Sequence, residues 1–203
     1  MQGKIFEGDY KTRCKNIDSL LCVGDTFDML KREIRLGDRH AVFYMIDGFL
    51  KGEVLEKIME FFLSLAPEDV PETYEDFLKK CTPYGDIVTV TTEQDFLHYV
   101  LSGLTGFVVE GYDEILVIDL RDYPSRSVEE PDKDKVLRGS RDGFVEAIMP
   151  NIALIRRRIR DVDLKFEIYS IGSSSRTDIS VVYMKDRVNQ KALSIIQKRL
   201  KKI

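Results

Sequence analysis

The sequence predicts an α/β fold made of two small mixed α/β subdomains joined by a charged, proline-containing linker. Strand-like apolar runs alternate with helical apolar periodicity along most of the chain, and this pattern stops between residues 122 and 142. A chain of 203 residues with 43% hydrophobic content can bury one sizeable core or two smaller ones. We therefore expect an N-terminal subdomain over residues 1–122 and a second over residues 123–203, which includes the linker 123–142.

The first predicted elements are a strand pair and two helices. Two extended segments within residues 27–46 surround a turn at Gly37 and Asp38, and the second contains an unbroken apolar run, as in a buried strand. Apolar residues then recur at helical spacing over residues 54–65, which predicts an amphipathic helix. A proline-containing loop leads from it to a short predicted helix over residues 74–80.

A strand-to-helix step and a second strand pair complete the first subdomain. Residues 87–91 alternate in the manner of a strand, and Thr91 with Gln94 matches the capping box that begins a helix. The apolar runs 107–109 and 115–120 then flank a turn between two strands. Together these elements predict a βαβ-like unit with added hairpins.

The linker is polar and dense in charges, and it contains Pro124 and Pro131, so it cannot form a packed core. We expect its own ion pairs to order it. The available partners are Arg121, Arg126, Arg138 and Arg141 with Asp122, Glu129, Glu130 and Asp142. Its acids do not predict a metal site, because adjacent lysines would neutralise them.

Beyond the linker the pattern resumes. Apolar residues within 144–159 fall on one helical face, although Pro150 removes a backbone donor and is expected to kink or split that helix. Two strands are predicted at 164–169 and 178–184. The last helix begins after Asn189, which is a favourable N-cap residue.

Composition narrows the classes of function. The chain has 31 basic and 35 acidic residues and a net charge of −4, which is too balanced for a general nucleic-acid binder. The cysteines Cys14, Cys22 and Cys81 form neither a CxxC pair nor a metal-ligand cluster, which fits a reducing compartment. No segment approaches the roughly 20 apolar residues that cross a bilayer, so we expect the chain itself to be soluble.

The residues give little support for catalysis, and we expect the chain to be no enzyme and to hold no metal or cofactor. An enzyme needs a nucleophile, an acid or base, or a metal held by converging side chains. His40 lies in a predicted hairpin and His98 on a predicted helix, so no histidine pair shares a turn. The Gly-Ser-Ser-Ser loop 172–175 could cradle an anion, but it joins two strands rather than opening a helix, which favours a plain loop.

The sharpest basic feature is an arginine run, which comprises Arg156, Arg157, Arg158 and Arg160. Two interpretations stay open: these cations complement the dipole at a helix C-terminus, or they form a contact surface for a partner subunit or acidic lipid. On a helix, Arg156 and Arg160 share a face while the other two point elsewhere, so the four cannot serve one small ligand. We expect an internal carboxylate to hold at least one of them, with Asp161 and Asp163 the nearest in sequence.

Three segments resemble the N-terminal region of the GerA family, the A subunits of bacterial spore germinant receptors and their paralogues. They are R-x-Y-P-x-R-S-V-x-E-P at 121–131, L-R-G-S-R-D-G-F-V-E at 137–146 and A-L-I-R-R-R-I-R-D at 153–161. The Asp47-Gly48 turn between a strand pair and a helix is also similar, so the resemblance covers most of the chain. Pro150 departs from the family pattern, which has a bulky apolar residue there.

The resemblance implies a spore inner-membrane protein whose N-terminal portion, on the cytoplasmic (core) side, precedes a multi-helix membrane domain. Its expected partners are receptor B and C subunits and other A subunits. The basic residues Lys198, Arg199, Lys201 and Lys202 would then fit the cytoplasmic side of a bilayer. Two roles follow: a regulatory and assembly domain that transmits the germinant signal through protein contacts, or a sensor with a small molecule in a cleft between the subdomains.

Overall fold

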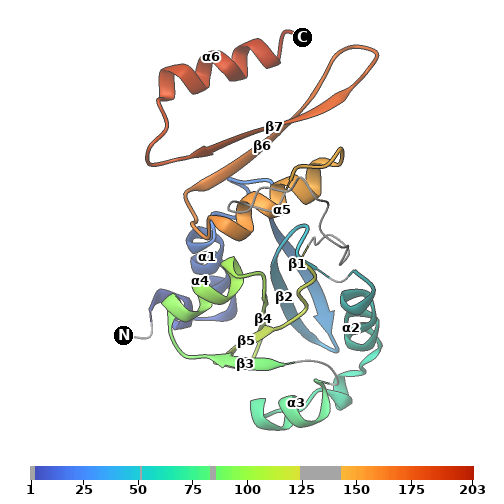
Figure 1. Cartoon of the computed structure of the whole chain (residues 1–203). Helices are drawn as coiled ribbons and strands as arrows, with labels where there is room; N and C mark the ends of the chain where they lie inside the picture. Colours follow the sequence, from blue (N-terminus) through green and yellow to red (C-terminus); the bar gives the residue numbers. More distant parts are fainter. Residues whose placement is uncertain (1–2, 51, 83–85, 124–142) are drawn as a thin grey trace, which may run out of the picture.

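A five-stranded sheet and a separate two-stranded hairpin form the framework of the molecule (Figure 1). The computed structural model describes residues 3–50, 52–82, 86–123 and 143–203. The mixed α/β class predicted from the sequence is confirmed. The division of the chain at residue 122 stays a prediction, and nearly all of the linker lies outside the described residues.

The five-stranded sheet is built from strand pairs and a single strand, with helices between them along the chain. Its strands are β1 (Met29–Leu36), β2 (Arg39–Ile46), β3 (Ile87–Val90), β4 (Thr105–Val109) and β5 (Ile115–Ile118). The helices beside it are α1 (Tyr10–Leu20), α2 (Gly52–Ser64), α3 (Tyr74–Lys80) and α4 (Glu93–Leu101), with short 3₁₀ turns at Lys4–Phe6 and Pro67–Asp69.

All neighbouring strands of this sheet are antiparallel, in the order β1-β2-β4-β5-β3. Because β3 and β4 are each antiparallel to β5, they run parallel to one another with β5 between them. The helix α4 connects them, so the predicted βαβ-like unit is present in a split form. In the first strand pair, Met29 lies opposite Ile46.

The two faces of the sheet bury different cores. Residues of α1 and α4 pack on one face, where Tyr44 and Val108 are fully buried. On the other face, α2 and α3 contribute Phe62 and Phe77, and the rings of Phe62 and Phe107 stack with centroids 5.1 Å apart. The sequence had not predicted α1. Its N-cap is Asp9, whose carboxylate accepts a hydrogen bond from the backbone of Thr12 at 2.9 Å.

The hairpin lies between two helices (Figure 1). It consists of β6 (Leu164–Ile171) and β7 (Thr177–Met184), and its helices are α5 (Ile148–Arg158) and α6 (Gln190–Leu200). The helix α5 contributes to two cores. Ile152 packs with the hairpin residue Phe166 in a small separate core, and Ala153 belongs to the core that α1 and α4 form with the five-stranded sheet. The Asn189 side chain caps α6 as predicted.

Three local predictions were wrong. Thr92, not Thr91, is the N-cap of α4, and its hydroxyl accepts from the Asp95 backbone at 3.0 Å. The helix α5 begins at Ile148, so Pro150 lies in its first turn, where backbone N–H groups have no intrahelical acceptor and no kink is needed. Phe144 lies outside the helix and is 69% exposed.

Candidate functional site

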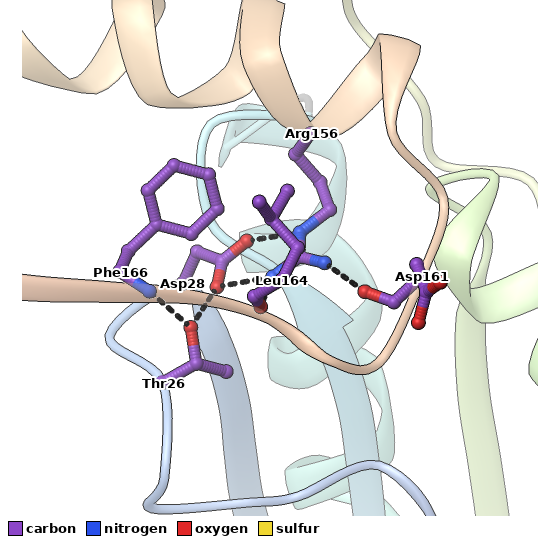
Figure 2. A network of polar contacts seen from close by, with 6 residues as sticks. All are labelled: Thr26, Asp28, Arg156, Asp161, Leu164 and Phe166. Atoms are coloured by element: carbon purple, nitrogen blue, oxygen red, sulfur yellow. Dashed lines mark hydrogen bonds and ion pairs between the residues drawn. The ribbon is translucent and has the colours of Figure 1, made fainter. Parts of the chain in front are cut away.

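A buried ion pair joins α5 to the beginning of β1 (Figure 2). Arg156 is 1% exposed and Asp28 is fully buried. The Arg156 guanidinium donates from Nε to Asp28 Oδ2 at 2.6 Å and from Nη2 to Asp28 Oδ1 at 3.0 Å. It also donates to the carbonyl oxygens of Asp161, at 2.6 Å, and Leu164, at 2.8 Å. These contacts link α5, β1 and β6 through one side chain.

Thr26 extends this network to the hairpin. Its hydroxyl donates to Asp28 Oδ1 at 2.6 Å and accepts from the Phe166 backbone N–H at 3.1 Å. The Phe27 N–H donates to the Phe166 carbonyl at 2.9 Å, so a short stretch of backbone before β1 pairs with β6. The Phe166 ring lies under the guanidinium, 5.1 Å from Arg156 Cζ. We call Thr26, Asp28, Arg156 and Phe166 the junction.

The turn between β2 and α2 lets α5 come close to the sheet. Gly48 has a φ of +82°, a conformation that glycine adopts without steric cost. A Cβ atom at this position would lie 3.1 Å from Ala153 Cβ. The Asp47-Gly48 turn noted in the sequence therefore lets α5 pack closely against it, beside the junction.

The junction corrects the prediction about Arg156. An internal carboxylate does hold this arginine, as expected, but the carboxylate belongs to Asp28, far away in sequence. Asp161 contributes its carbonyl oxygen instead. Because Arg156 is buried, it cannot be part of a contact surface. The prediction that Arg160 continues the same helical face was also wrong, since α5 ends at Arg158.

Two predicted arginines lie over the Tyr123 ring, and a third binds Ser102, which also holds the Tyr123 hydroxyl. The Cζ atom of Arg157 lies 4.5 Å from the centre of the Tyr123 ring and that of Arg121 lies 5.9 Å away. The Tyr123 hydroxyl donates to the Ser102 carbonyl, and Arg160 Nη1 donates to Ser102 Oγ at 3.0 Å. We call Ser102, Arg121, Tyr123, Arg157 and Arg160 the Tyr123 cluster.

Arg121 anchors the base of this cluster. Its guanidinium forms a forked pair with Asp119, with Nε at 2.8 Å from Oδ1, and this hydrogen bonding raises the pKa of Arg121. Its backbone forms a β-bridge with Leu50. Behind Tyr123, the Phe49 ring packs edge-on with centroids 5.0 Å apart. Phe49, Arg121 and Arg157 therefore all contact the Tyr123 ring, and its hydroxyl is held by Ser102.

The remaining predicted site residues divide into two groups. Arg157, Arg158 and Arg160 are exposed at and after the end of α5. The linker residues Arg126, Glu129, Glu130, Arg138 and Arg141 lie outside the described residues. Sequence reasoning missed the roles of Asp28 and Ser102. An acid between the apolar residues Phe27 and Met29, just before β1, was the only signal for Asp28.

The predictions about metal binding, membrane crossing and the loop 172–175 do not involve the junction. Over the described ranges, no group of three or more His, Cys, Asp or Glu side chains could hold a metal ion. In the same part of the chain, no helix is long and apolar enough to cross a membrane. A shallow cavity of about 440 Å³ lies beside Gly172 and Ser173 at the hairpin tip, next to Lys201, and not between α5 and the five-stranded sheet.

Comparison with known proteins gives consistent results. The family model for the Bacillus/Clostridium GerA spore germination protein matches residues 17–203. Stage V sporulation protein AF of Bacillus subtilis is 34% identical over 183 residues, which are 89% of this chain and 37% of that protein. Spore germination protein KA of Bacillus subtilis is 28% identical over 186 residues, 89% of this chain and 34% of that protein. The chain thus spans little more than a third of the length of these relatives.

The fold also has a counterpart of known structure. It is the N-terminal domain of the A subunit of the Bacillus megaterium spore germinant receptor GerK3, with a TM-score of 0.69 and 21% identity. The likeness covers 96% of this chain and 72% of that one. The resemblance noted in the sequence is thereby confirmed, and since the family model matches nearly the whole chain, the protein belongs to the GerA family of spore germination proteins.

Proposed function

We propose that this chain is a non-catalytic regulatory and assembly domain of a spore germinant receptor A subunit. The single observation that carries the proposal is the Tyr123 cluster, in which Arg157 and Arg160 are exposed yet held by an aromatic ring and a hydroxyl. Side chains fixed before binding lose little conformational freedom when a partner arrives. Guanidinium groups in such positions suit carboxylates on a partner protein.

The position of the cluster allows a partner that binds there to affect how α5 packs in the fold. Arg157 directly follows Arg156 in the last turn of α5, and Arg156 is bound to Asp28 at the start of β1. A partner that engages Arg157 therefore acts on the helix that packs against both the hairpin and the five-stranded sheet. Small shifts at packed contacts of this kind are one way in which binding is passed through a protein.

We infer that the partners are the receptor B and C subunits and further A subunits, on the cytoplasmic (core) side of the spore inner membrane. The support is family membership together with the likeness to an A-subunit domain of a germinant receptor. The polar groups of the Tyr123 cluster are arginines, a tyrosine and a serine, and Ser102 Oγ is bound to Arg160 rather than to a base. This arrangement suits recognition better than nucleophilic catalysis.

The test is co-purification of the receptor from spore membranes. An A subunit with Arg157→Glu and Arg160→Glu should recover much less B and C subunit than the unchanged protein. The matched control is Arg32→Glu with Arg35→Glu, two exposed arginines of β1 away from the cluster. Equal recovery by both double variants would refute the proposal. So would a thermal-shift screen in which an amino acid, sugar or nucleotide strongly stabilises the chain, since this would indicate small-molecule sensing.

A further inference from the structure

The helix α6 has a basic outer surface at one extremity of the molecule. Figure 1 shows α6 on the far side of the hairpin from α5 and from the five-stranded sheet. The segment 187–203 contains Arg187, Lys191, Lys198, Arg199, Lys201 and Lys202 and no Asp or Glu, although the whole chain has a net charge of −4. Because α6 contains no acidic residue, its own side chains do not neutralise these positive charges.

The contacts of α6 define which side faces outward. Leu193 is 6% exposed, and Gln197 Nε2 donates to both carboxylate oxygens of Glu167 on β6, at 3.0 and 2.8 Å. Ile195 lies two residues from each of them, which is about 200° around the helix. Ile195 therefore points away from the hairpin, and it is 52% exposed.

Three cations of α6 share this outward side with Ile195, and a fourth closely follows the helix. Lys191, Lys198 and Arg199 stand four residues before and three and four residues after it, which places them along one helical stripe, and Lys202 follows in the turn after α6. All four are exposed, and within the described part of the chain none forms a salt bridge. Ile196 and Ile203 flank the stripe with 47% and 68% exposure. We call Lys191, Ile195, Lys198, Arg199 and Lys202 the α6 outer face.

We propose that the α6 outer face lies against an anionic lipid bilayer. A helix with basic residues around exposed aliphatic side chains binds in the plane of a membrane interface, with its cations at the lipid phosphates. The aliphatic stems of lysine and arginine allow this position while Ile195 enters the apolar boundary. Protein–protein interface cores are instead depleted of charge and enriched in aromatic residues, which the α6 outer face lacks.

Vesicle co-sedimentation of this chain tests the proposal. The chain should sediment with vesicles of equal parts phosphatidylcholine and phosphatidylglycerol and remain in the supernatant with phosphatidylcholine alone. Each basic residue near an anionic surface strengthens partition by about fivefold, so Lys198→Glu with Arg199→Glu and Lys202→Glu should weaken it by more than tenfold. The control, Lys79→Glu with Lys80→Glu at the end of α3, should bind as the unchanged chain does.

Ile195→Ser separates the apolar contribution from the charge. It should weaken binding severalfold, whereas Leu63→Ser, at a 58% exposed position on α2, should not. The Ile195→Ser and Leu63→Ser variants, and the unchanged chain at high salt, test the proposal without relying on how well the charge-reversed chain folds. Binding that is equal on both vesicle types, or unaffected by these substitutions, would overturn the proposal. The proposal would also be overturned if sedimentation without vesicles showed that the α6 outer face binds only nucleic acid or only a second copy of the chain.

This inference is independent of the role proposed for the Tyr123 cluster. The α6 outer face and the cluster lie on different sides of the hairpin, so Arg157→Glu should leave vesicle binding unchanged. Loss of subunit co-purification with normal vesicle binding, or the reverse, would therefore show which of the two proposals fails.

Discussion

Arg156 and Asp28 form a buried, forked ion pair across 128 residues of sequence, with two hydrogen bonds of 2.6 and 3.0 Å. Both side chains are almost completely buried, so solvent cannot take the place of either partner. Removing one member leaves an uncompensated buried charge, which typically costs about 3–5 kcal/mol. The pair therefore ties the position of α5 on the sheet to a contact between segments that are distant in sequence.

The first prediction concerns this pair. Arg156→Met should lower the free energy of unfolding by about 3–5 kcal/mol, measured by urea denaturation, because Asp28 then remains buried without its cation. Asp28→Leu combined with Arg156→Met should be less destabilised than the Arg156→Met variant alone, since no charge is left unpaired. If the two single effects simply add in the double variant, the pair is not coupled as the structure indicates.

The second prediction concerns the close approach of α5 to the Asp47-Gly48 turn. Gly48→Ala should destabilise the chain by about 1–2 kcal/mol, because alanine is strained at positive φ and its Cβ would crowd Ala153. Gly52→Ala is the matched control, since Gly52 begins α2 and a Cβ there meets nothing within 4 Å. That change should be neutral or stabilising. Thermal melting of the two variants in opposite order would contradict the described turn.

The third prediction follows from the position of Pro150. Pro150→Ala should change the free energy of unfolding by less than about 1 kcal/mol, because a first-turn N–H has no intrahelical acceptor. Leu154→Pro, in the interior of the same helix, should cost about 3 kcal/mol or more. Chemical denaturation distinguishes these outcomes. A large gain on replacing Pro150 would mean that the proline does distort α5.

The fourth prediction concerns pH and the attachment of α6. Burial would raise the pKa of Glu167, but hydrogen bonds from Tyr169, Tyr183 and Gln197 outweigh it, and the pKa is lowered from its ordinary value of 4.5. The ionised carboxylate therefore stabilises the fold above pH 4.5, and this contribution disappears as the pH falls through the lower folded value.

Glu167→Gln should consequently lose less stability on acidification than the unchanged chain. The measurement is the melting temperature at neutral pH and at several values below 4.5. Glu68→Gln, an exposed substitution in the 3₁₀ turn, provides the control. An unchanged acid dependence in the Glu167 variant would show that this carboxylate does not hold α6.

The sequence predicted elements whose signals are local. The turn at Gly37 and Asp38, the helix Tyr74–Lys80 and the Asn189 cap all appear as expected, because turn chemistry and caps depend on neighbouring residues. The helix α1 was missed because most of its residues are polar. Phe144 extended the apparent apolar face of α5 beyond the true helix, which wrongly placed Pro150 in its interior.

The candidate site was only partly predictable for a different reason. Arg156 and Arg157 were singled out together, but their fates depend on partners that local periodicity cannot identify. Arg156 binds Asp28 in the core, whereas Arg157 points about 100° further round the helix and lies over the Tyr123 ring. Pairing over such separations is decided by how the elements pack, so sequence spacing alone favoured Asp161 and Asp163.

The most direct test of the proposed function is the germination of spores whose receptor carries Arg157→Glu. Its cation–π contact is exposed, so the purified chain should melt within a few degrees of the unchanged one. Germination rate per A subunit in the spore membrane should fall at least about fivefold, while the control Arg35→Glu, at an exposed position on β1, germinates normally. Normal germination by an Arg157→Glu receptor that is folded and present at its usual level would contradict a signalling role for the Tyr123 cluster.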